Sequence, residues 1–162
     1  MASTITSATM KVTIAEQIVL NGRDQGSKNT LSISGIKDVF KRIITIAADD
    51  DATVLVFKST TAIADGALDL QNVKYIRVTN LDDTTSVTLS LQSDVGEDDS
   101  AADESASLLL EAGKSFIMGV PNDGIGISDA DASLVTDLVD LESLVVFTGS
   151  DAIDVEIFVA SV

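Results

Sequence analysis

Hydrophobic and polar residues alternate along most of this chain, in short runs that are separated by polar turns. Ile76 and Val78 alternate with Tyr, Arg and Thr side chains, and residues 87–91 repeat the pattern after a polar stretch at residues 81–86. A period of two places the apolar side chains on one face of a strand, so each run predicts a half-buried β-strand. Because the two runs flank a polar turn, we expect residues 75–93 to form a β-hairpin.

The same alternation recurs roughly every ten residues, which is the spacing of an all-β sandwich or barrel. Asn21-Gly22 is a strong hairpin signal, and residues 106–120 predict another hairpin-like pair of strands that turns at Ala112-Gly113. Residues 133–147 combine a helical spacing of apolar residues with a strand-like end, so we expect a short helix or turn and then a strand. The other expected strands fall within residues 11–20, 29–36, 40–48, 54–60, 68–80, 106–113, 114–120 and 154–162.

This pattern predicts the fold class: all-β, an antiparallel β-sandwich that is jelly-roll-like or immunoglobulin-like, with at most one short helix. The length of 162 residues suits one domain. Residues 1–10 are rich in Ser, Thr and Ala and are expected to be a flexible N-terminal arm, and residues 11–162 a single β-sandwich domain. Aromatic residues make up only 4% of the chain, so Val, Ile, Leu and Ala must supply the core. Val and Ile again favour strands.

The candidate chemistry is sparse, because the chain contains no histidine and no cysteine. Their absence removes the usual general base near neutral pH, the Ser-His pair, thiolate metal ligands and disulfides. We therefore expect a protein that is not an enzyme and uses no cofactor. A hydrolase that works with two carboxylates is the enzymatic alternative, since acidic residues are abundant.

The formal net charge of −16 argues against two classes of partner. Such a surface repels phosphate backbones and anionic lipids, so we expect neither nucleic-acid nor membrane binding. The N-terminal residues lack the basic and apolar regions of a signal peptide, and no segment has the length of a membrane-spanning helix.

Two polar loops offer weak candidate sites. Asp129 and Asp131 have the alternate spacing of the first ligands of a calcium loop, but the glycine and the glutamate that should follow are missing. A polar turn is therefore the better interpretation. Residues 124–126 are a fragment of a glycine-rich phosphate loop without its third glycine, which favours an ordinary surface loop.

Lys37, Lys41 and Arg42 lie within six positions and form the one local concentration of positive charge. Two interpretations stay open. The three basic side chains balance the charge of neighbouring acidic residues, or they form a docking point for an acidic partner surface.

Four segments of the chain, taken in order, carry a resemblance to a known family. They are TIAEQIVLNGRDQGSKNTLSISGIKDVFKRIITI, ALDLQNVKYIRVTNLDDTTSVTLSLQ, LLLEAGKSFIMG and DVEIFVA. Together they cover most of residues 11–160 and resemble small β-sandwich virion structural proteins, of the capsid decoration or cement type, from tailed bacteriophages of marine bacteria and cyanobacteria.

The resemblance implies a non-enzymatic virion structural protein, and first of all a capsid decoration protein that binds and stabilises the phage head. Its partners would be the major capsid protein or another virion protein, together with further copies of itself, for example in a trimer. It would reside in the virion after assembly in the host cytoplasm. The alternatives are a neck, tail or fibre-associated virion protein, and a module that binds carbohydrate or the host surface.

Overall fold

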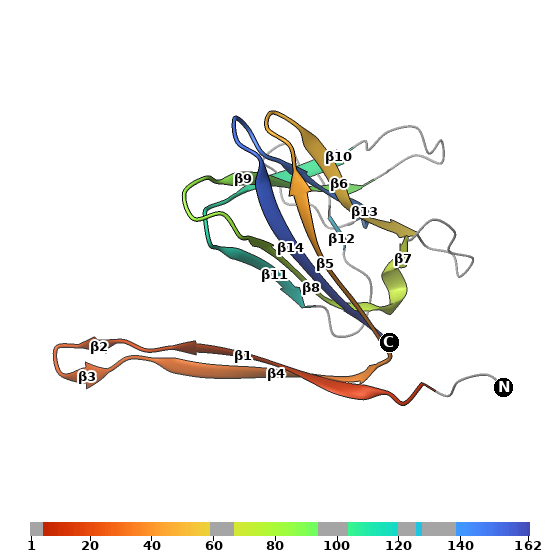
Figure 1. Cartoon of the computed structure of the whole chain (residues 1–162). Coiled ribbons are helices and arrows are strands. Elements are labelled where there is room, and N and C mark those ends of the chain that lie inside the picture. The colour runs from red at the N-terminus through yellow and green to blue at the C-terminus, as the bar shows by residue number, and fades with distance from the viewer. Residues whose placement is uncertain (1–4, 59–66, 94–103, 120–125, 128–138) are drawn as a thin grey trace.

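The chain folds into two β-sheets packed face to face, with a long β-hairpin projecting beside them (Figure 1). The structure is a computed structural model that describes residues 5–58, 67–93, 104–119, 126–127 and 139–162. The predicted all-β sandwich is confirmed, since a single 3₁₀ turn at Leu70–Asn72 is the helical element within these residues. Residues 133–138 of the segment with a helical spacing lie outside the described residues. The expected strand is present, but it begins at Val139, so Leu141 and Glu142, which fitted the helical face, belong to a strand and that part of the helix prediction is wrong.

Each sheet draws its strands from distant parts of the chain. The six-stranded sheet follows the order β10 (Glu104–Leu110), β9 (Val87–Ser93), β13 (Val139–Phe147), β6 (Asp51–Lys58) and β7 (Leu68–Asp69), with β12 (Gly126–Ile127) paired to β13. The four-stranded sheet follows the order β11 (Ser115–Gly119), β8 (Val73–Asn80), β14 (Ile153–Ser161) and β5 (Asp38–Ile46). The strands within both sheets pair antiparallel, apart from the short parallel contact between β6 and β7.

The core lies between the two sheets and consists almost wholly of aliphatic side chains. Ile76 and Ile157 of the four-stranded sheet and Leu89 and Leu144 of the six-stranded sheet are all fully buried in one cluster. Their strands alternate, as the sequence predicted, and the inward positions carry Val, Ile and Leu. Burying such a side chain is worth about 1.5–3 kcal/mol, so this cluster dominates the stability of the sandwich.

The expected hairpin at residues 75–93 is wrong, although both of its strands exist. β8 pairs with β11 and β14, whereas β9 pairs with β10 and β13, so residues 81–86 cross from one sheet to the other as an arch. The hairpin expected at residues 106–120 is wrong for the same reason, because the turn after β10 is a second arch, which leads back to β11 in the other sheet. Since β10 pairs with β9 and β11 pairs with β8, the two arches stack on each other.

Asn80 joins the two arches and is completely buried. Its side-chain amide donates to the carbonyl oxygen of Thr85 in the first arch at 2.8 Å, and to that of Leu110 beside the second arch at 3.2 Å. Its side-chain oxygen accepts a hydrogen bond from the backbone N–H of Asp82 at 3.0 Å. One buried polar side chain therefore fixes both crossings between the sheets.

The projecting hairpin is built from β1 (Ala8–Glu16) and β4 (Ser27–Ile36), with β2 (Val19–Leu20) and β3 (Arg23–Asp24) at its tip. Asn21 and Gly22 have φ values of 52° and 76°, so the predicted Asn-Gly turn is confirmed as a two-residue turn of the mirror-image type. β1 begins at Ala8, so the hairpin extends into the segment 1–10, of which residues 1–4 lie outside the described residues.

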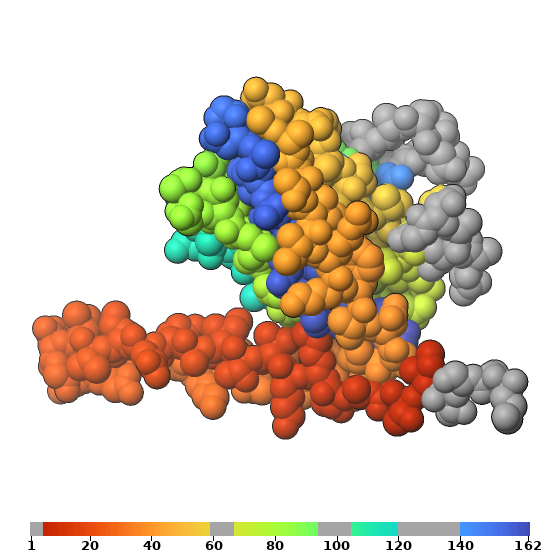
Figure 2. All heavy atoms as spheres, in the orientation of Figure 1, coloured from red at the N-terminus to blue at the C-terminus, as the bar shows by residue number. Residues whose placement is uncertain are grey.

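The base of the hairpin packs on the four-stranded sheet. Ile33 and Ile36 form a second buried cluster with Tyr75 and Ala160, on the face of that sheet that points away from the core. Only Lys37 separates β4 from β5, and its backbone N–H donates to the carbonyl oxygen of Ser161 at 2.9 Å. The hairpin is therefore anchored at one end, while its tip extends past the sandwich (Figures 1 and 2).

Candidate interaction surface

One surface that combines a polar network with apolar side chains is the side of the four-stranded sheet that faces away from the core. Because strand residues alternate, the neighbours of the buried core residues must point outward. We call this surface the outer face, and it consists of Val39, Lys41, Ile43, Thr45, Tyr75, Arg77, Thr79, Ser115, Ile117, Asp154, Glu156, Phe158 and Ala160.

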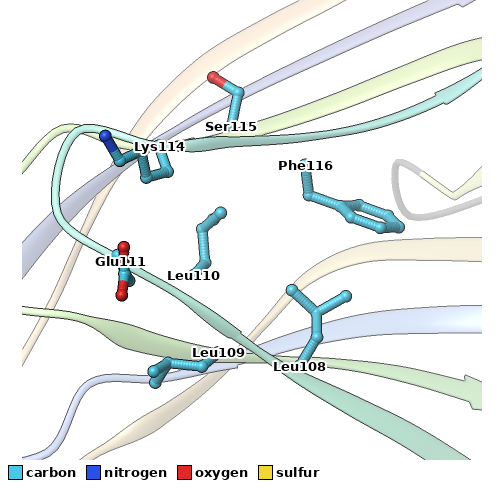
Figure 3. A pocket seen from close by; sticks show the side chains of 7 residues that line it. All are labelled: Leu108, Leu109, Leu110, Glu111, Lys114, Ser115 and Phe116. Atoms are coloured by element: carbon cyan, nitrogen blue, oxygen red, sulfur yellow. The ribbon is translucent and has the colours of Figure 1, made fainter.

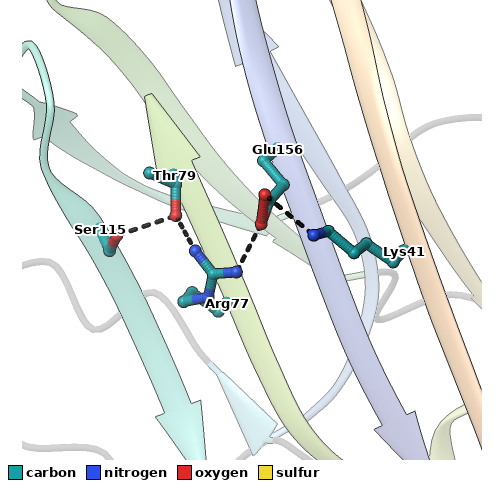
Figure 4. A network of polar contacts seen from close by, with 5 residues as sticks. All are labelled: Lys41, Arg77, Thr79, Ser115 and Glu156. Atoms are coloured by element: carbon teal, nitrogen blue, oxygen red, sulfur yellow. Dashed lines mark hydrogen bonds and ion pairs between the residues drawn. The ribbon is translucent and has the colours of Figure 1, made fainter. Parts of the chain in front are cut away.

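A polar network crosses all four strands at the centre of the outer face (Figure 4). Arg77 donates from one terminal nitrogen to Glu156 Oε1 and from the other to Thr79 Oγ1, each at 2.5 Å. Lys41 Nζ lies 3.5 Å from Glu156 Oε2, and the hydroxyls of Thr79 and Ser115 are 2.8 Å apart. The ionised groups of the network are therefore paired with one another.

The hydrogen bond from Arg77 holds the pKa of Glu156 below its usual range, and the positive charges of Arg77 and Lys41 act in the same direction. Glu156 is therefore a carboxylate near neutral pH, and not a proton donor. Burial raises the pKa of Tyr75, although the charge of Arg77 opposes this shift. The network thus adds charge-assisted hydrogen bonds between neighbouring strands of the sheet.

Apolar side chains surround this network. The ring of Phe158 packs edge-on against Tyr75, with centroids 6.0 Å apart, and the Arg77 guanidinium carbon lies 5.9 Å from the Phe158 centroid. Ile43 is 55% exposed and Ile117 is 42% exposed. The outer face therefore combines satisfied charges with uncovered aliphatic groups, a composition that suits protein contact.

The projecting hairpin carries a second uncovered apolar surface. In its register Met10 lies opposite Ile33, and Val12 lies opposite Leu31. Ile14 follows on the same face, since it is two residues further along β1. We call these five residues the apolar stripe.

The apolar stripe becomes steadily more exposed away from the sandwich. Ile33 is 7% exposed at the base, Leu31 is 40% exposed, and Ile14 is 49% exposed. The tip adds the exposed residues Ile18, Val19 and Leu20. The opposite face is polar, with the hydroxyls of Thr13 and Thr30 3.2 Å apart. The part of the hairpin that extends past the four-stranded sheet is therefore amphipathic, with one apolar and one polar face that are both exposed.

An apolar groove opens between the edge strands β10 and β11, with a volume of about 470 Å³ (Figure 3). Leu108, Leu110 and Phe116 line it, and Glu111 and Lys114 lie at the turn that closes one end. Ser115 completes the polar end, so the groove has hydrocarbon walls and a polar rim at the turn.

The three basic residues singled out in the sequence are not brought together in one cluster. Lys41 lies on the outer face and pairs with Glu156. Arg42 is exposed on the opposite side of β5, since successive strand residues point to opposite faces. Lys37 is exposed and precedes β5. Glu156 could not be recognised as the acidic partner from the sequence, because it lies on a distant strand; even Arg77, on the neighbouring strand β8, is 79 residues away from it.

The predicted weak metal site at Asp129 and Asp131 lies outside the described residues, as do Gly124 and Ile125. Within the described ranges, no group of three or more Asp and Glu side chains is placed to hold a metal ion. The same ranges contain no helix that is long and apolar enough to cross a membrane.

Comparisons with known proteins add little to this description. No protein-family model matches the chain, and no curated protein matches it. Among solved structures it is similar to a chain from "Bacillus endospore appendages form a novel family of disulfide-linked pili", with a TM-score of 0.37 and 12% identity over 76% of this chain and 87% of that one. A likeness this distant assigns no function, and this chain has no cysteine with which to form a disulfide.

Proposed function

We propose that this chain is a non-enzymatic structural protein of a virion, and that it decorates and stabilises a phage capsid. The observation that carries the proposal is the projecting hairpin. An isolated two-stranded hairpin is only marginally stable in water, and this one leaves aliphatic residues of its apolar stripe exposed. Such an element is expected in a protein that works inside an assembly.

The chemistry of the described surfaces supports a structural role. The charged groups of the polar network on the outer face, Lys41, Arg77 and Glu156, are paired with each other, and the groove between β10 and β11 has hydrocarbon walls. The virion setting comes from the resemblance of the four sequence segments to phage decoration proteins. A decoration protein stabilises a shell because it binds the assembled lattice and not the separated subunits.

Quantitative mass spectrometry of purified particles from the virus that encodes this chain tests the proposal. We expect the chain to be present in a fixed ratio to the major capsid protein. Particles made without the gene should release their DNA at lower temperature, and adding the purified protein should restore the release temperature. A few copies per particle would instead indicate a neck, tail or fibre component, and absence from the particles would refute a virion role.

A further inference from the structure

We infer that the uncovered part of the projecting hairpin docks on the outer face of a second copy of this chain. Each copy has one hairpin and one outer face, and a contact between two different surfaces forms either a closed oligomer or an open chain. The inferred form is the smallest closed one, a two-fold dimer that exchanges hairpins. This inference concerns a contact between copies and does not depend on the proposed role in a virion.

The apolar stripe and the outer face already match within one chain. At the base of the hairpin, Ile33 of the stripe is buried against Tyr75 and Ala160 of the outer face. Beyond this contact the hairpin leads away from the sandwich (Figure 2), so Ile14 and Leu31 stay exposed. A second copy can extend the same kind of contact along the stripe.

The outer face has a matching uncovered region. Val39, Ile43 and Ile117 are 50%, 55% and 42% exposed, respectively, and lie on the two edge strands of the sheet, β5 and β11. The hairpin of the same chain covers only the end of the sheet near Tyr75 and Ala160. Each copy therefore has two uncovered apolar surfaces that it cannot bring together itself.

The distribution of charge favours a second copy over other partners. The hairpin, residues 8–36, holds three basic and two acidic residues, whereas the whole chain holds ten and 26. The hairpin therefore carries a net charge of +1, and the rest of the chain carries −17. The hairpin of one copy is therefore attracted to the body of another, although the whole chain is strongly acidic. A nucleic acid would be repelled by that body.

Covering the outer face would bury its polar network without leaving a charge unpaired. Glu156 is held by Arg77 and Lys41, and the side chain of Glu156 is already only 14% exposed. Burial of a charge is most costly where a partner is missing, and here the partners are in place before docking.

Sedimentation velocity of the purified full chain over a range of concentrations tests the inference. We expect a closed oligomer, and we expect Ile14→Thr with Leu31→Thr to weaken its association by about a hundredfold, since two buried aliphatic side chains are lost. Threonine keeps the preference for strands. The matched control is Leu109→Thr, which removes an exposed leucine (64% exposed) from the six-stranded sheet and should leave association unchanged. A chain that is monomeric at every concentration would overturn the inference.

A disulfide test locates the contact without relying on affinity. Because the chain has no cysteine, single substitutions introduce unique thiols. We expect Leu31→Cys in one copy and Ile43→Cys in a differently tagged copy to cross-link under mild oxidation, whereas Leu31→Cys and Leu109→Cys should not. Equal cross-linking in both mixtures would refute the assigned surface. If virus particles contain the chain in a fixed ratio but the purified chain stays monomeric, the decoration proposal stands and the contact between copies is refuted.

Discussion

Replacing Asn80 by alanine should destabilise the protein more than any other single loss of a polar side chain among the described residues. The substitution removes two donated hydrogen bonds, to Thr85 and Leu110, and one accepted from Asp82. Each such bond contributes about 0.5–1.5 kcal/mol net, and a buried partner left unsatisfied costs about 1–3 kcal/mol. Because Asn80 is completely buried, we expect a total loss of about 3 kcal/mol.

Urea denaturation followed by circular dichroism measures this loss. With a slope of about 2 kcal/mol per molar urea, a loss of about 3 kcal/mol lowers the midpoint by about 1.5 M. The control is Asn72→Ala. The side-chain amide of Asn72 likewise donates a hydrogen bond, here to Asp69 Oδ2 at 2.9 Å, but Asn72 is exposed. That variant should lose about 0.5 kcal/mol or less. Equal midpoints for the two variants would refute the idea that Asn80 holds the arches together.

Three further predictions concern the outer face and the hairpin. Glu156→Gln should be less stable than the parent at pH 7. The pKa of Glu156 is lower in the folded state than its ordinary value of 4.5. The ionised side chain therefore stabilises the fold above pH 4.5, and this stabilisation disappears as the pH falls through the folded-state pKa. Urea midpoints between pH 7 and 3 should therefore converge, and a constant gap would contradict the ion-pair explanation. Because the pKa of Tyr75 is raised above its ordinary value of 10.0, the parent should lose stability as the pH rises above that value, whereas Tyr75→Phe should not. If the urea midpoints of the two proteins fell in parallel up to a pH of about 11, the burial of the Tyr75 hydroxyl would not explain the loss. Ile33→Ala should weaken the packing at the base of the hairpin. Amide hydrogen exchange in residues 8–36 should then accelerate several-fold more than exchange in β8 and β14. A uniform acceleration would show that the hairpin and the sandwich unfold together.

The sequence predicted the strands well because alternation is a local property. Asn21-Gly22 specified a tight hairpin turn, and the structure has that turn with both residues in the left-handed region. Alternation in residues 75–93 also located β8 and β9. It could not show which strands pair, because Ile76 and Leu89 face the same core whether their strands are neighbours in one sheet or lie in opposite sheets.

The candidate surface depended on contacts that no local pattern contains. Lys41, Arg77 and Glu156 come from three strands that are far apart in the sequence, and only the strand order brings them together. The apolar stripe was visible as alternation in residues 11–20, and it was interpreted as one face of a half-buried strand. Only the fold shows that the hairpin extends beyond the sandwich and stays uncovered.

The position of β14 has a consequence for how the protein forms. β14 follows every other described strand in the chain, yet it lies inside the four-stranded sheet, between β8 and β5. Thr45 of β5 and its hydrogen-bond partner Asp154 of β14 are 109 residues apart. The sheet cannot be completed until the ribosome has made the chain through Ser161, and contacts of such long range slow folding. Until then β5 and β8 expose unpaired edges, so newly made chains would be prone to aggregation when synthesis is fast.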